Sequence, residues 1–375
     1  MSGAIGGAMS DAVGAIGGTG ATAAAGVRSL VSVLLVTRDG AATLGETLAA
    51  IRAQRTELPF EVVAIDSGST DGTLALLARG ADRLLEVPPG EFNHGTTRNA
   101  GIAACRGELV ALLVQDALPA ADDWLASLTA PLLADPRLAG TCARQLPRPG
   151  ASAVTRHYLA RWAAAAAEPR TMEVRDARAW SALSPAERLA LCTFDDVCSC
   201  LRRSVWERFP FRPTPIAEDV EWAREVLLAG WRLAYTPRAR VVHSHERSAR
   251  HELRRTRAIH RRLGTLFGLR TIPAARHLLR ACATTVPLHA RLAWRQPAGL
   301  PRALALAVAW PLGQYLGGRA AARDLAADRE PAAAPDAAAA PDAAAAQDRA
   351  ATHDPAATRH PAPARDRPPA APGER

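Results

Sequence analysis

The sequence predicts an α/β protein with a mostly parallel sheet flanked by helices, followed by a helical C-terminal extension. Three apolar runs, at 30–36, 60–65 and 109–114, have the length and composition of strands that are buried on both faces. Each run ends in a polar loop, and segments with apolar residues at helical spacing lie between them. This repeated order of strand, loop and helix is typical of a parallel α/β sheet.

Composition locates the charge of the chain and limits its partners. The 375 residues carry a formal net charge of +9, and every basic side chain other than histidine is an arginine. Between residues 236 and 297 the arginines far outnumber the two glutamates, so the basic character is local. A local basic block suggests a phosphate-rich partner, such as an anionic membrane surface, a lipid diphosphate or nucleic acid. The six cysteines show no zinc-site spacing, and we expect reduced, mostly buried thiols in a cytoplasmic protein.

Composition also divides the chain into four parts. Residues 1–28 are mostly small and nearly uncharged and lack the features of a signal peptide, so we expect a disordered leader. The α/β domain is expected at 29–250, and a basic helical region at 251–330. Residues 331–375 are rich in alanine and proline without periodicity, which predicts a disordered tail.

The first two predicted strands end in polar residues. The first runs into Thr37-Arg38-Asp39-Gly40, and the second, Phe60–Ile65, is followed directly by Asp66. A carboxylate at such a strand end can accept hydrogen bonds from the base or ribose of a nucleotide, whereas Asp71 is better explained as a helix N-cap. The chain has neither a Gly-x-Gly-x-x-Gly after the first strand nor a Walker-type loop with lysine. These absences argue against a dinucleotide oxidoreductase and a P-loop enzyme.

The segment Glu91–Gly101 is dense in side chains that bind phosphate or sugar oxygens. Arg98 can contact phosphate through two parallel hydrogen bonds, and we expect Arg98 and Asn99 to bind a ligand of this kind. His94 is either a further ligand-binding residue or only a loop histidine.

The buried strand 109–114 stops at Gln115-Asp116, and a helix is expected at Ala121–Leu133. An acid at the C-terminal end of a parallel strand lies where open α/β sheets bind ligands. Asp116 could therefore hold a divalent metal against a diphosphate, or it could only cap a turn.

Two later segments add acids and histidines. Gly140–Gln145 is expected as an edge strand and Phe194–Leu201 as a strand entering the ligand-binding face. Glu218 and Asp219 open a predicted helix that ends near residue 230, where they could cap the helix or supply a general base.

An extended segment at 239–242 then leads to His243-Ser244-His245. Two histidines two residues apart on an extended segment point the same way. That arrangement suits a metal or a diphosphate, although a structural role is also open.

Taken together, the order of these features resembles the inverting family 2 glycosyltransferases of the GT-A fold, over about residues 29–250. The chain looks most like their bacterial rhamnosyltransferase-like branch. The motifs that carry this resemblance are Glu91-Phe92-Asn93-His94-Gly95, Gln115-Asp116-Ala117 and Arg144-Gln145-Leu146-Pro147.

The resemblance implies a nucleotide-diphosphate sugar as the donor, with rhamnose as the sugar that the branch suggests. Asp66 and Thr37 would line the base pocket, and Arg98 would lie near the diphosphate. His94 and Asn99 complete the donor-binding residues that we expect.

The resemblance also implies a metal and a base. Asp116 corresponds to the last acid of the family's Asp-x-Asp motif and would hold Mg²⁺ or Mn²⁺, with His243 assisting. Val114 stands where the family usually has its first metal-side aspartate. Asp219, with Glu218 beside it, would take the proton from an acceptor hydroxyl in a single inverting displacement.

The basic region after residue 251 lacks a segment of the ~20 apolar residues needed to span a bilayer. We expect helices that lie peripherally on an anionic membrane, on the inner face of the cell membrane, and present a lipid-linked or glycan acceptor. A solvated basic helical cap is the alternative. A non-catalytic nucleotide-sugar-binding or scaffold protein also stays open, whereas nucleic acid is not expected, because no recognised binding module is present.

Overall fold

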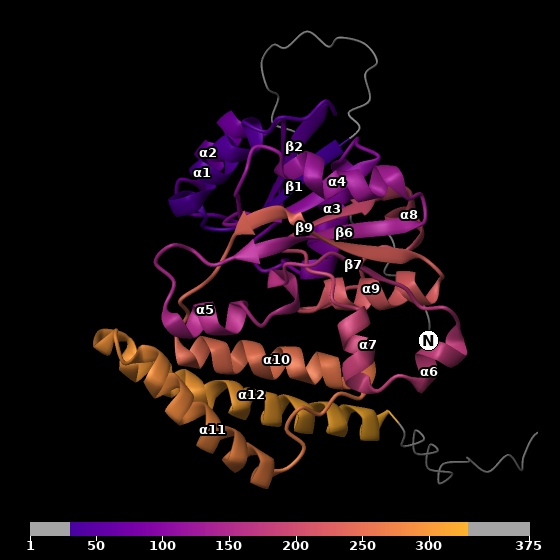
Figure 1. Ribbon diagram of the computed structural model, residues 1–375. Coiled ribbons are helices and arrows are strands. Elements are labelled where there is room, and N and C mark those ends of the chain that lie inside the picture. Colours follow the sequence, from indigo (N-terminus) through magenta and orange to yellow (C-terminus); the bar gives the residue numbers. More distant parts are fainter. Residues whose placement is uncertain (1–30, 329–375) are drawn as a thin grey trace, which may run out of the picture. The chain divides into compact units, whose positions relative to one another are not determined.

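The computed structural model describes residues 31–328, which form an α/β domain followed by three long helices (Figure 1). The leader and the tail predicted at 1–28 and 331–375 lie outside these residues. Within them, nine strands form one sheet in the order β3-β2-β1-β4-β8-β6-β9-β5, and β7 pairs with β9. The strands are β1 (Val31–Thr37), β2 (Phe60–Asp66), β3 (Arg83–Glu86), β4 (Leu109–Val114), β5 (Leu118–Pro119), β6 (Leu138–Leu146), β7 (Arg170–Met172), β8 (Cys198–Arg202) and β9 (Arg232–Val242).

Helices cover both faces of the sheet. They are α1 (Ala41–Arg52), α2 (Thr73–Gly80), α3 (His94–Ala104), α4 (Trp124–Ala134), α5 (Ala153–Leu159), α6 (Ala177–Ala182), α7 (Pro185–Leu191), α8 (Arg203–Arg208), α9 (Glu218–Leu228), α10 (Ala249–Phe267), α11 (Ala275–Ala293) and α12 (Leu300–Ala327). Along β1, Val33 and Leu35 join a core with α1, α2 and α4, whereas Leu34 joins a second core with α3 and α9. Two such cores explain why the central strands are mostly apolar on both faces.

The central strands β3, β2, β1 and β4 are parallel, as the sequence predicts, and β8 runs antiparallel between β4 and β6. The predicted fold class is therefore confirmed. Because β1 and β2 pair in register, Thr37 lies directly beside Asp66 at their C-terminal ends. The order of the strands brings the C-terminal ends of β1, β2, β4, β6 and β9 to one edge of the sheet, where β8 begins.

The prediction that Gly140–Gln145 is an edge strand is wrong. The observed strand β6 lies inside the sheet, with β8 on one side and β9 in parallel on the other. Strand β9, from a distant part of the sequence, pairs with β6 on the side that was expected to be open. Its register shifts between Ala143 and Arg144, so that Pro237, which has no N–H to donate, lies in a bulge.

The strand expected at Phe194–Leu201 begins later than predicted, at Cys198. Residues Asp195 and Asp196 therefore lie in the loop that enters the sheet edge and not within a strand. All six cysteines are free, and five of them are buried, in agreement with the expected reduced thiols.

The C-terminal helices α10 and α12 pack closely and run in the same direction. Their close approach depends on glycines: a Cβ at Gly317 would lie 2.5 Å from the carbonyl oxygen of Arg257, and one at Gly264 would lie 2.4 Å from the Cβ of Ala321. Helix α10 joins the core of the α/β domain through Leu263 and Phe267. None of the helices within residues 31–328 is both long and apolar enough to cross a membrane.

Candidate active site

The polar residues singled out in the sequence gather at the edge of the sheet where the parallel strands end. Asp66 ends β2, Asp116 lies two residues after β4, and His243 follows β9. Residues Asp195 and Asp196 reach the same edge because β8 is antiparallel and begins where its neighbours end. Helix α9 begins with Glu218 and Asp219 close to this edge, since Asp219 Oδ2 lies 3.4 Å from the amide nitrogen of Asp196.

Asp66 is fully buried and orders its own loop. Its carboxylate accepts hydrogen bonds from the hydroxyls of Thr37 (2.8 Å) and Ser69 (2.6 Å). It also accepts hydrogen bonds from the backbone amides of Gly68 (3.0 Å) and Ser69 (2.8 Å). These four bonds hold the loop between β2 and α2 in place, and contact of Thr37 and Asp66 with a nucleotide base stays a prediction.

Two asparagines of the segment Glu91–Gly101 form hydrogen bonds within α3 and with residues 211–214, which precede α9. Asn93 caps α3 through the amides of Gly95 and Thr96 and also accepts a hydrogen bond from the amide of Thr214 (3.1 Å). Asn99 donates to the carbonyl of Phe211 (2.7 Å) and accepts from its amide (3.0 Å). Asn99 thus helps to hold the approach to the acid pair, and its role in donor binding stays a prediction.

Arg98 lies in the middle of an acid cluster that consists of Asp195, Asp196, Glu218 and Asp219. Its side chain is only 7% exposed, and Nη1 lies 2.5 Å from Oε1 of Glu218 while Nε lies 3.4 Å from Oδ2 of Asp196. His94 Nδ1 lies 3.6 Å from the same oxygen of Glu218. The guanidinium that we predicted near a diphosphate is therefore engaged with carboxylates in this structure, and its contact with the donor stays a prediction.

Asp219 differs from Glu218 and Asp196, which pair with Arg98, and from Asp195, which accepts side-chain hydrogen bonds from Gln145 and Trp162. Within residues 31–328 no arginine or histidine lies within ion-pair distance of its carboxylate, which accepts only backbone hydrogen bonds. Burial, together with the neighbouring Glu218 and Asp196, raises the pKa of Asp219 well above its usual range. Burial likewise raises the pKa of Asp196 to about 7, against the opposing effect of the Arg98 guanidinium. A carboxylate with a raised pKa accepts a proton more readily, as a general base must.

The backbone that presents the acid pair is strained. Ala217, at the N-cap of α9, has a φ of 61°, in the left-handed region that residues other than glycine rarely adopt. Such a conformation costs on the order of 1 kcal/mol and persists only where the surrounding structure holds it. It turns the chain so that Glu218 and Asp219 occupy the first turn of α9, facing Arg98 and the loop before β8.

Asp116, His243 and His245 form a second cluster, in which one potential ligand atom from each residue lies within 4.8 Å of the other two. Asp116 Oδ1 is 3.7 Å from Nε2 of His243, and Oδ2 is 3.6 Å from Nε2 of His245. These distances are long for hydrogen bonds but suit two ligands that each lie about 2.1 Å from one metal ion. The three residues therefore fit a divalent metal, with one carboxylate and two imidazoles.

The buried side chain of Gln145 connects the two clusters. Its Nε2 donates to Oδ2 of Asp195 (2.6 Å), and its Oε1 lies 2.9 Å from Nδ1 of His243. The amide oxygen can only accept, so the imidazole proton resides on Nδ1 and the lone pair of Nε2 faces Asp116. Burial lowers the pKa of His243 to about 4, which keeps the ring neutral at neutral pH. A neutral ring with a free Nε2 is the form that binds a metal.

Replacing Gln145 by leucine is expected to weaken Mn²⁺ binding by about 10–100-fold, the usual effect of losing a hydrogen bond behind a ligating histidine. The change removes the acceptor that fixes the His243 ring but leaves all three ligands in place. Titration of Mn²⁺ followed by electron paramagnetic resonance would measure the loss. The control is Gln54→Leu, at a partly buried glutamine whose side chain donates to the carbonyl of Ala121 and not to a histidine. Unchanged affinity in the Gln145 variant would contradict the assignment.

Sequence reasoning missed several of these residues. Gln145 stands in one of the motifs that carry the family resemblance, yet nothing in the sequence shows that it contacts His243, 98 residues away. Asp195 and Asp196 were hidden inside a predicted strand. His245 was recognised in the sequence as part of the His-x-His pair, but only His243 was assigned to the metal, whereas the structure places both histidines beside Asp116.

Comparisons with known proteins show which family part of the chain resembles. The model of the family "Glycosyl transferase family 2" matches residues 32–203. The O-antigen chain rhamnosyltransferase RfbN of Salmonella typhimurium is 29% identical over 231 residues, which cover 60% of this chain and 69% of that protein. The O-antigen chain rhamnosyltransferase WbaN of Salmonella anatum is 31% identical over 207 residues, which cover 54% of this chain and 62% of that protein. This chain thus spans about two thirds of the length of each relative.

Among solved structures, the chain is similar to the mannosyltransferase PcManGT from Pyrobaculum calidifontis, in complex with GDP-Man and Mn²⁺. The TM-score is 0.49 at 22% identity, with 81% of this chain and 89% of that chain covered. It is also similar to the glucosyl-3-phosphoglycerate synthase of Mycobacterium tuberculosis, with a TM-score of 0.46 at 19% identity over 66% of this chain and 82% of that chain. The family match and the order of motifs together identify residues 32–203 as a glycosyl transferase family 2 domain, which is an enzyme domain.

Proposed function

We propose that this protein is an inverting glycosyltransferase that moves a sugar from a nucleotide-diphosphate donor to a hydroxyl of a lipid-linked or glycan acceptor. The observation that carries the proposal is the position of Asp219, a carboxylate without a cationic partner among the described residues, at the sheet edge that also holds the metal cluster. Rhamnose is the sugar that we propose, because both curated relatives are rhamnosyltransferases of O-antigen chains. The process served would be the synthesis of a cell-envelope polysaccharide.

In the proposed reaction Asp219 removes the proton from the acceptor hydroxyl, and the oxygen attacks the anomeric carbon. The bond from that carbon to the diphosphate oxygen breaks on the opposite face, so the configuration inverts and the nucleoside diphosphate leaves. A divalent metal, when bound, offsets the charge that develops on the diphosphate. Arg98 neutralises part of the charge of Glu218 and Asp196, which allows a third carboxylate to lie beside them.

The donor set of the metal cluster supports Mn²⁺ over Mg²⁺. Mg²⁺ prefers an octahedral shell of oxygen ligands, whereas two of the three side chains here offer imidazole nitrogens. Asp116, His243 and His245 would hold the ion, and the diphosphate oxygens would complete its shell.

The proposal is tested by incubating the full chain with deoxythymidine-diphosphate rhamnose and other nucleotide sugars, with and without Mn²⁺. Thermal-shift measurements first identify the nucleotide that binds, because a ligand of the native state raises the melting temperature. Transfer to a glycan or lipid-linked acceptor, with an inverted anomeric linkage by NMR, is the expected result. Retention of the donor configuration in the product would overturn the inverting mechanism.

A second candidate is a nucleotide-sugar-binding protein that lacks catalysis. It is favoured by one observation, the presence of Val114 where the family usually has its first metal-side aspartate. In that case nucleotides would stabilise the protein against heat, but no acceptor would receive a sugar. Measuring binding and turnover on the same preparation separates the two functions.

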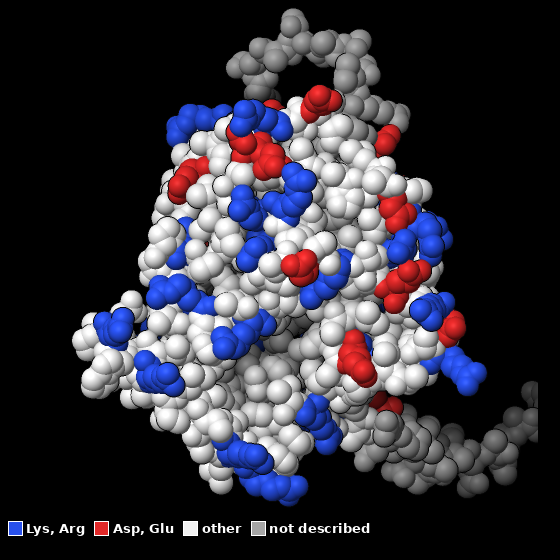
Figure 2. Space-filling view, in the orientation of Figure 1, with Lys and Arg blue, Asp and Glu red and all other residues white. Residues whose placement is uncertain are grey.

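We also propose that the protein contacts the inner face of an anionic cell membrane through α11. Its outward side exposes Leu279 (71%) and Trp294 at its C-terminal end (81%), interspersed with Arg276, Arg280 and Arg291. No acidic residue lies between 275 and 296. Figure 2 shows basic residues without acidic ones over the lower left part of the surface, where α11 lies in Figure 1. Apolar side chains among arginines are typical of helices that lie at a membrane interface.

Replacing Leu279 or Trp294 by glutamate is expected to lower the affinity for phosphatidylglycerol vesicles by about tenfold or more, because each change removes an apolar anchor and adds a repelled charge. Vesicle sedimentation measures the effect. Leu133, which is 54% exposed on α4, provides the matched control. Equal loss of binding in the Leu133→Glu variant, or none in the α11 variants, would remove α11 as the contact.

A further inference from the structure

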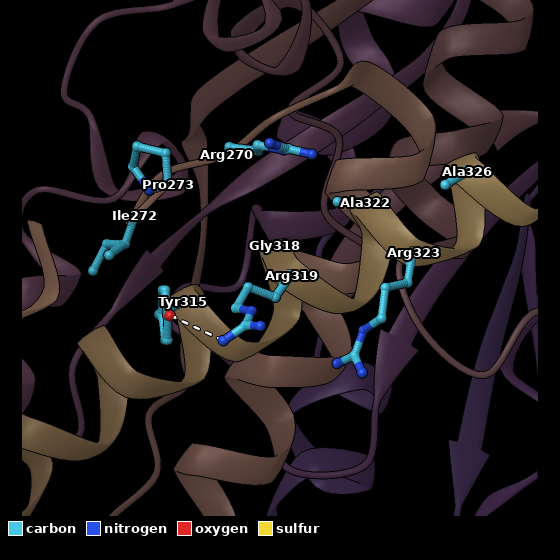
Figure 3. A pocket seen from close by; sticks show the side chains of 9 residues that line it. All are labelled: Arg270, Ile272, Pro273, Tyr315, Gly318, Arg319, Ala322, Arg323 and Ala326. Carbon is cyan, nitrogen blue, oxygen red and sulfur yellow. Dashed lines mark hydrogen bonds between the residues drawn. The ribbon is translucent and has the colours of Figure 1, made fainter. Parts of the chain in front are cut away.

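A pocket of about 370 Å³ lies in the C-terminal helices, away from both clusters of the candidate active site. Its walls are the connection between α10 and α11, which contributes Arg270, Ile272 and Pro273, and the second half of α12. Figure 3 shows Arg319 and Arg323 extending from α12, with Arg270 on the facing segment. No residue of the acid cluster or of the metal cluster lines this pocket, so it is a separate site.

The lining of the pocket is basic and has no acid. Within residues 31–328, none of the three arginines lies within ion-pair distance of a carboxylate. Asp324, the acid nearest along α12, is already engaged by Arg261 through two hydrogen bonds of 2.7 and 2.9 Å. In Figure 3 the side chains of Arg319 and Arg323 extend on one side of α12 and Arg270 lies on the other, so positive charge lies on both sides of the hollow and favours an anion near it. The charge of the pocket is therefore complementary to an anionic ligand.

One guanidinium is held in place by the protein. Nη1 of Arg319 donates to the hydroxyl of Tyr315 (3.2 Å), and its guanidinium carbon lies 5.6 Å from the centre of the tyrosine ring. The remaining N–H groups of Arg319 stay available for a ligand, since this side chain makes no other hydrogen bond with a described residue. Its orientation over the hollow is thus fixed before a ligand binds, which reduces the entropy cost of binding.

A glycine without a packing role lines the same hollow. Helix α12 carries three glycines, of which Gly313 and Gly317 let α10 approach closely. A Cβ at Gly318, by contrast, would meet no atom within 4 Å. Glycine in a helix interior costs roughly 1 kcal/mol relative to alanine, and packing does not explain this cost here. The missing side chain leaves space in the pocket lined by the arginines.

We propose that this pocket binds a phosphate-bearing ligand. Arg319, beside Tyr315, contacts the phosphate through charge-assisted hydrogen bonds near Gly318, and Arg270 and Arg323 add positive charge around it. The side chains of Ile272 and Pro273 offer an apolar wall to the group that carries the phosphate. Anionic phospholipid headgroups and soluble phosphorylated compounds share this chemistry.

The test titrates inorganic phosphate into the full chain by calorimetry, in the presence of a chelator that keeps divalent metals from the active site. The double variant Arg319→Gln, Arg323→Gln removes two charges, and Gly318→Leu fills the hollow without changing charge. Both are expected to weaken phosphate binding at least tenfold. Arg79→Gln, at an exposed arginine of α2, should bind phosphate like the original protein.

A second arm distinguishes the source of the phosphate. If the ligand is a lipid headgroup, Gly318→Leu also loses affinity for phosphatidylglycerol vesicles, and free phosphate competes with the vesicles. If the ligand is soluble, vesicle binding is unchanged in Gly318→Leu while phosphate binding is lost. Phosphate binding that is absent from the original protein, or equal in all the variants, would overturn the proposal. None of these readouts depends on sugar transfer, so failure here leaves the proposed function untouched.

Discussion

Replacing Asp219 by asparagine is expected to lower the rate of sugar transfer by about 10²–10⁴-fold, the range for loss of a general base. An amide cannot take the proton of the acceptor hydroxyl. The other acids of the cluster are already engaged, Glu218 and Asp196 with Arg98 and Asp195 with Gln145 and Trp162. The change is isosteric and leaves the ion pairs of Arg98 intact. Binding of the nucleotide, measured by thermal shift, should therefore persist while initial rates fall.

Glu57→Gln is a suitable control, since Glu57 is an exposed acid that precedes the N-terminal end of β2, whereas the candidate site lies at the C-terminal ends of the parallel strands. Full transfer activity in the Asp219 variant would show that another group acts as the base.

The pH dependence of transfer follows from the same carboxylate. Burial and the negative charge of Glu218 raise the pKa of Asp219, so its proton is held more tightly than in an ordinary aspartate. Only the deprotonated form can act as the base, and activity should therefore fall as the pH is lowered through this raised pKa. Glu218→Gln removes the negative neighbour and should move the acidic limb of the pH–rate profile to lower pH. A shift in the opposite direction would contradict this electrostatic account.

Replacing Asp116 by asparagine is expected to have the second large effect, a loss of Mn²⁺ affinity of about 100-fold or more. Removing a side chain that coordinates the metal should lower the affinity more than the 10–100-fold caused by changing a residue that only hydrogen-bonds to a coordinating side chain. Asp116 supplies the one negative charge of the metal cluster, because Val114 offers no carboxylate and His243 is neutral. Transfer activity should fall with the metal affinity and recover in part at high Mn²⁺ concentration.

Electron paramagnetic resonance measures bound Mn²⁺ in the Asp116 variant, with Asp122→Asn, an exposed acid outside the cluster, as the control. Recovery of activity at high Mn²⁺ would separate weak metal binding from misfolding. If the Asp116 variant binds Mn²⁺ as tightly as the original protein, the ion is held elsewhere.

The sequence was sufficient to predict the central strands but not the full order of the sheet. Apolar runs mark β1, β2 and β4 because both faces of these strands are buried, a local property of composition. The position of β6 depends on which distant strand pairs with it, and no local pattern near Gly140 contains that information. The sequence predicted an edge strand there, whereas β9 pairs with β6 along its second side.

In the candidate site, too, local features could be predicted from the sequence, whereas contacts between distant residues could not. Asp116 and His243 could be selected because strand ends and residue type are visible in the sequence. Whether Arg98 contacts a phosphate or a carboxylate depends on Glu218, which is brought to it only by the fold. The role of Gln145 depends on its hydrogen bonds with Asp195 and His243, which are 50 and 98 residues away in the sequence and which no local pattern predicts.

The long connection between β6 and β9 has a consequence for the synthesis of the chain. Gln145 and His243 meet across 98 residues, and pairing over such separations is slow because the connecting chain must first lose much of its freedom. A nascent chain on the ribosome already holds Asp116 and Asp219 before the two histidines have emerged. The site therefore cannot bind a metal in its native geometry until β9 has paired with β6.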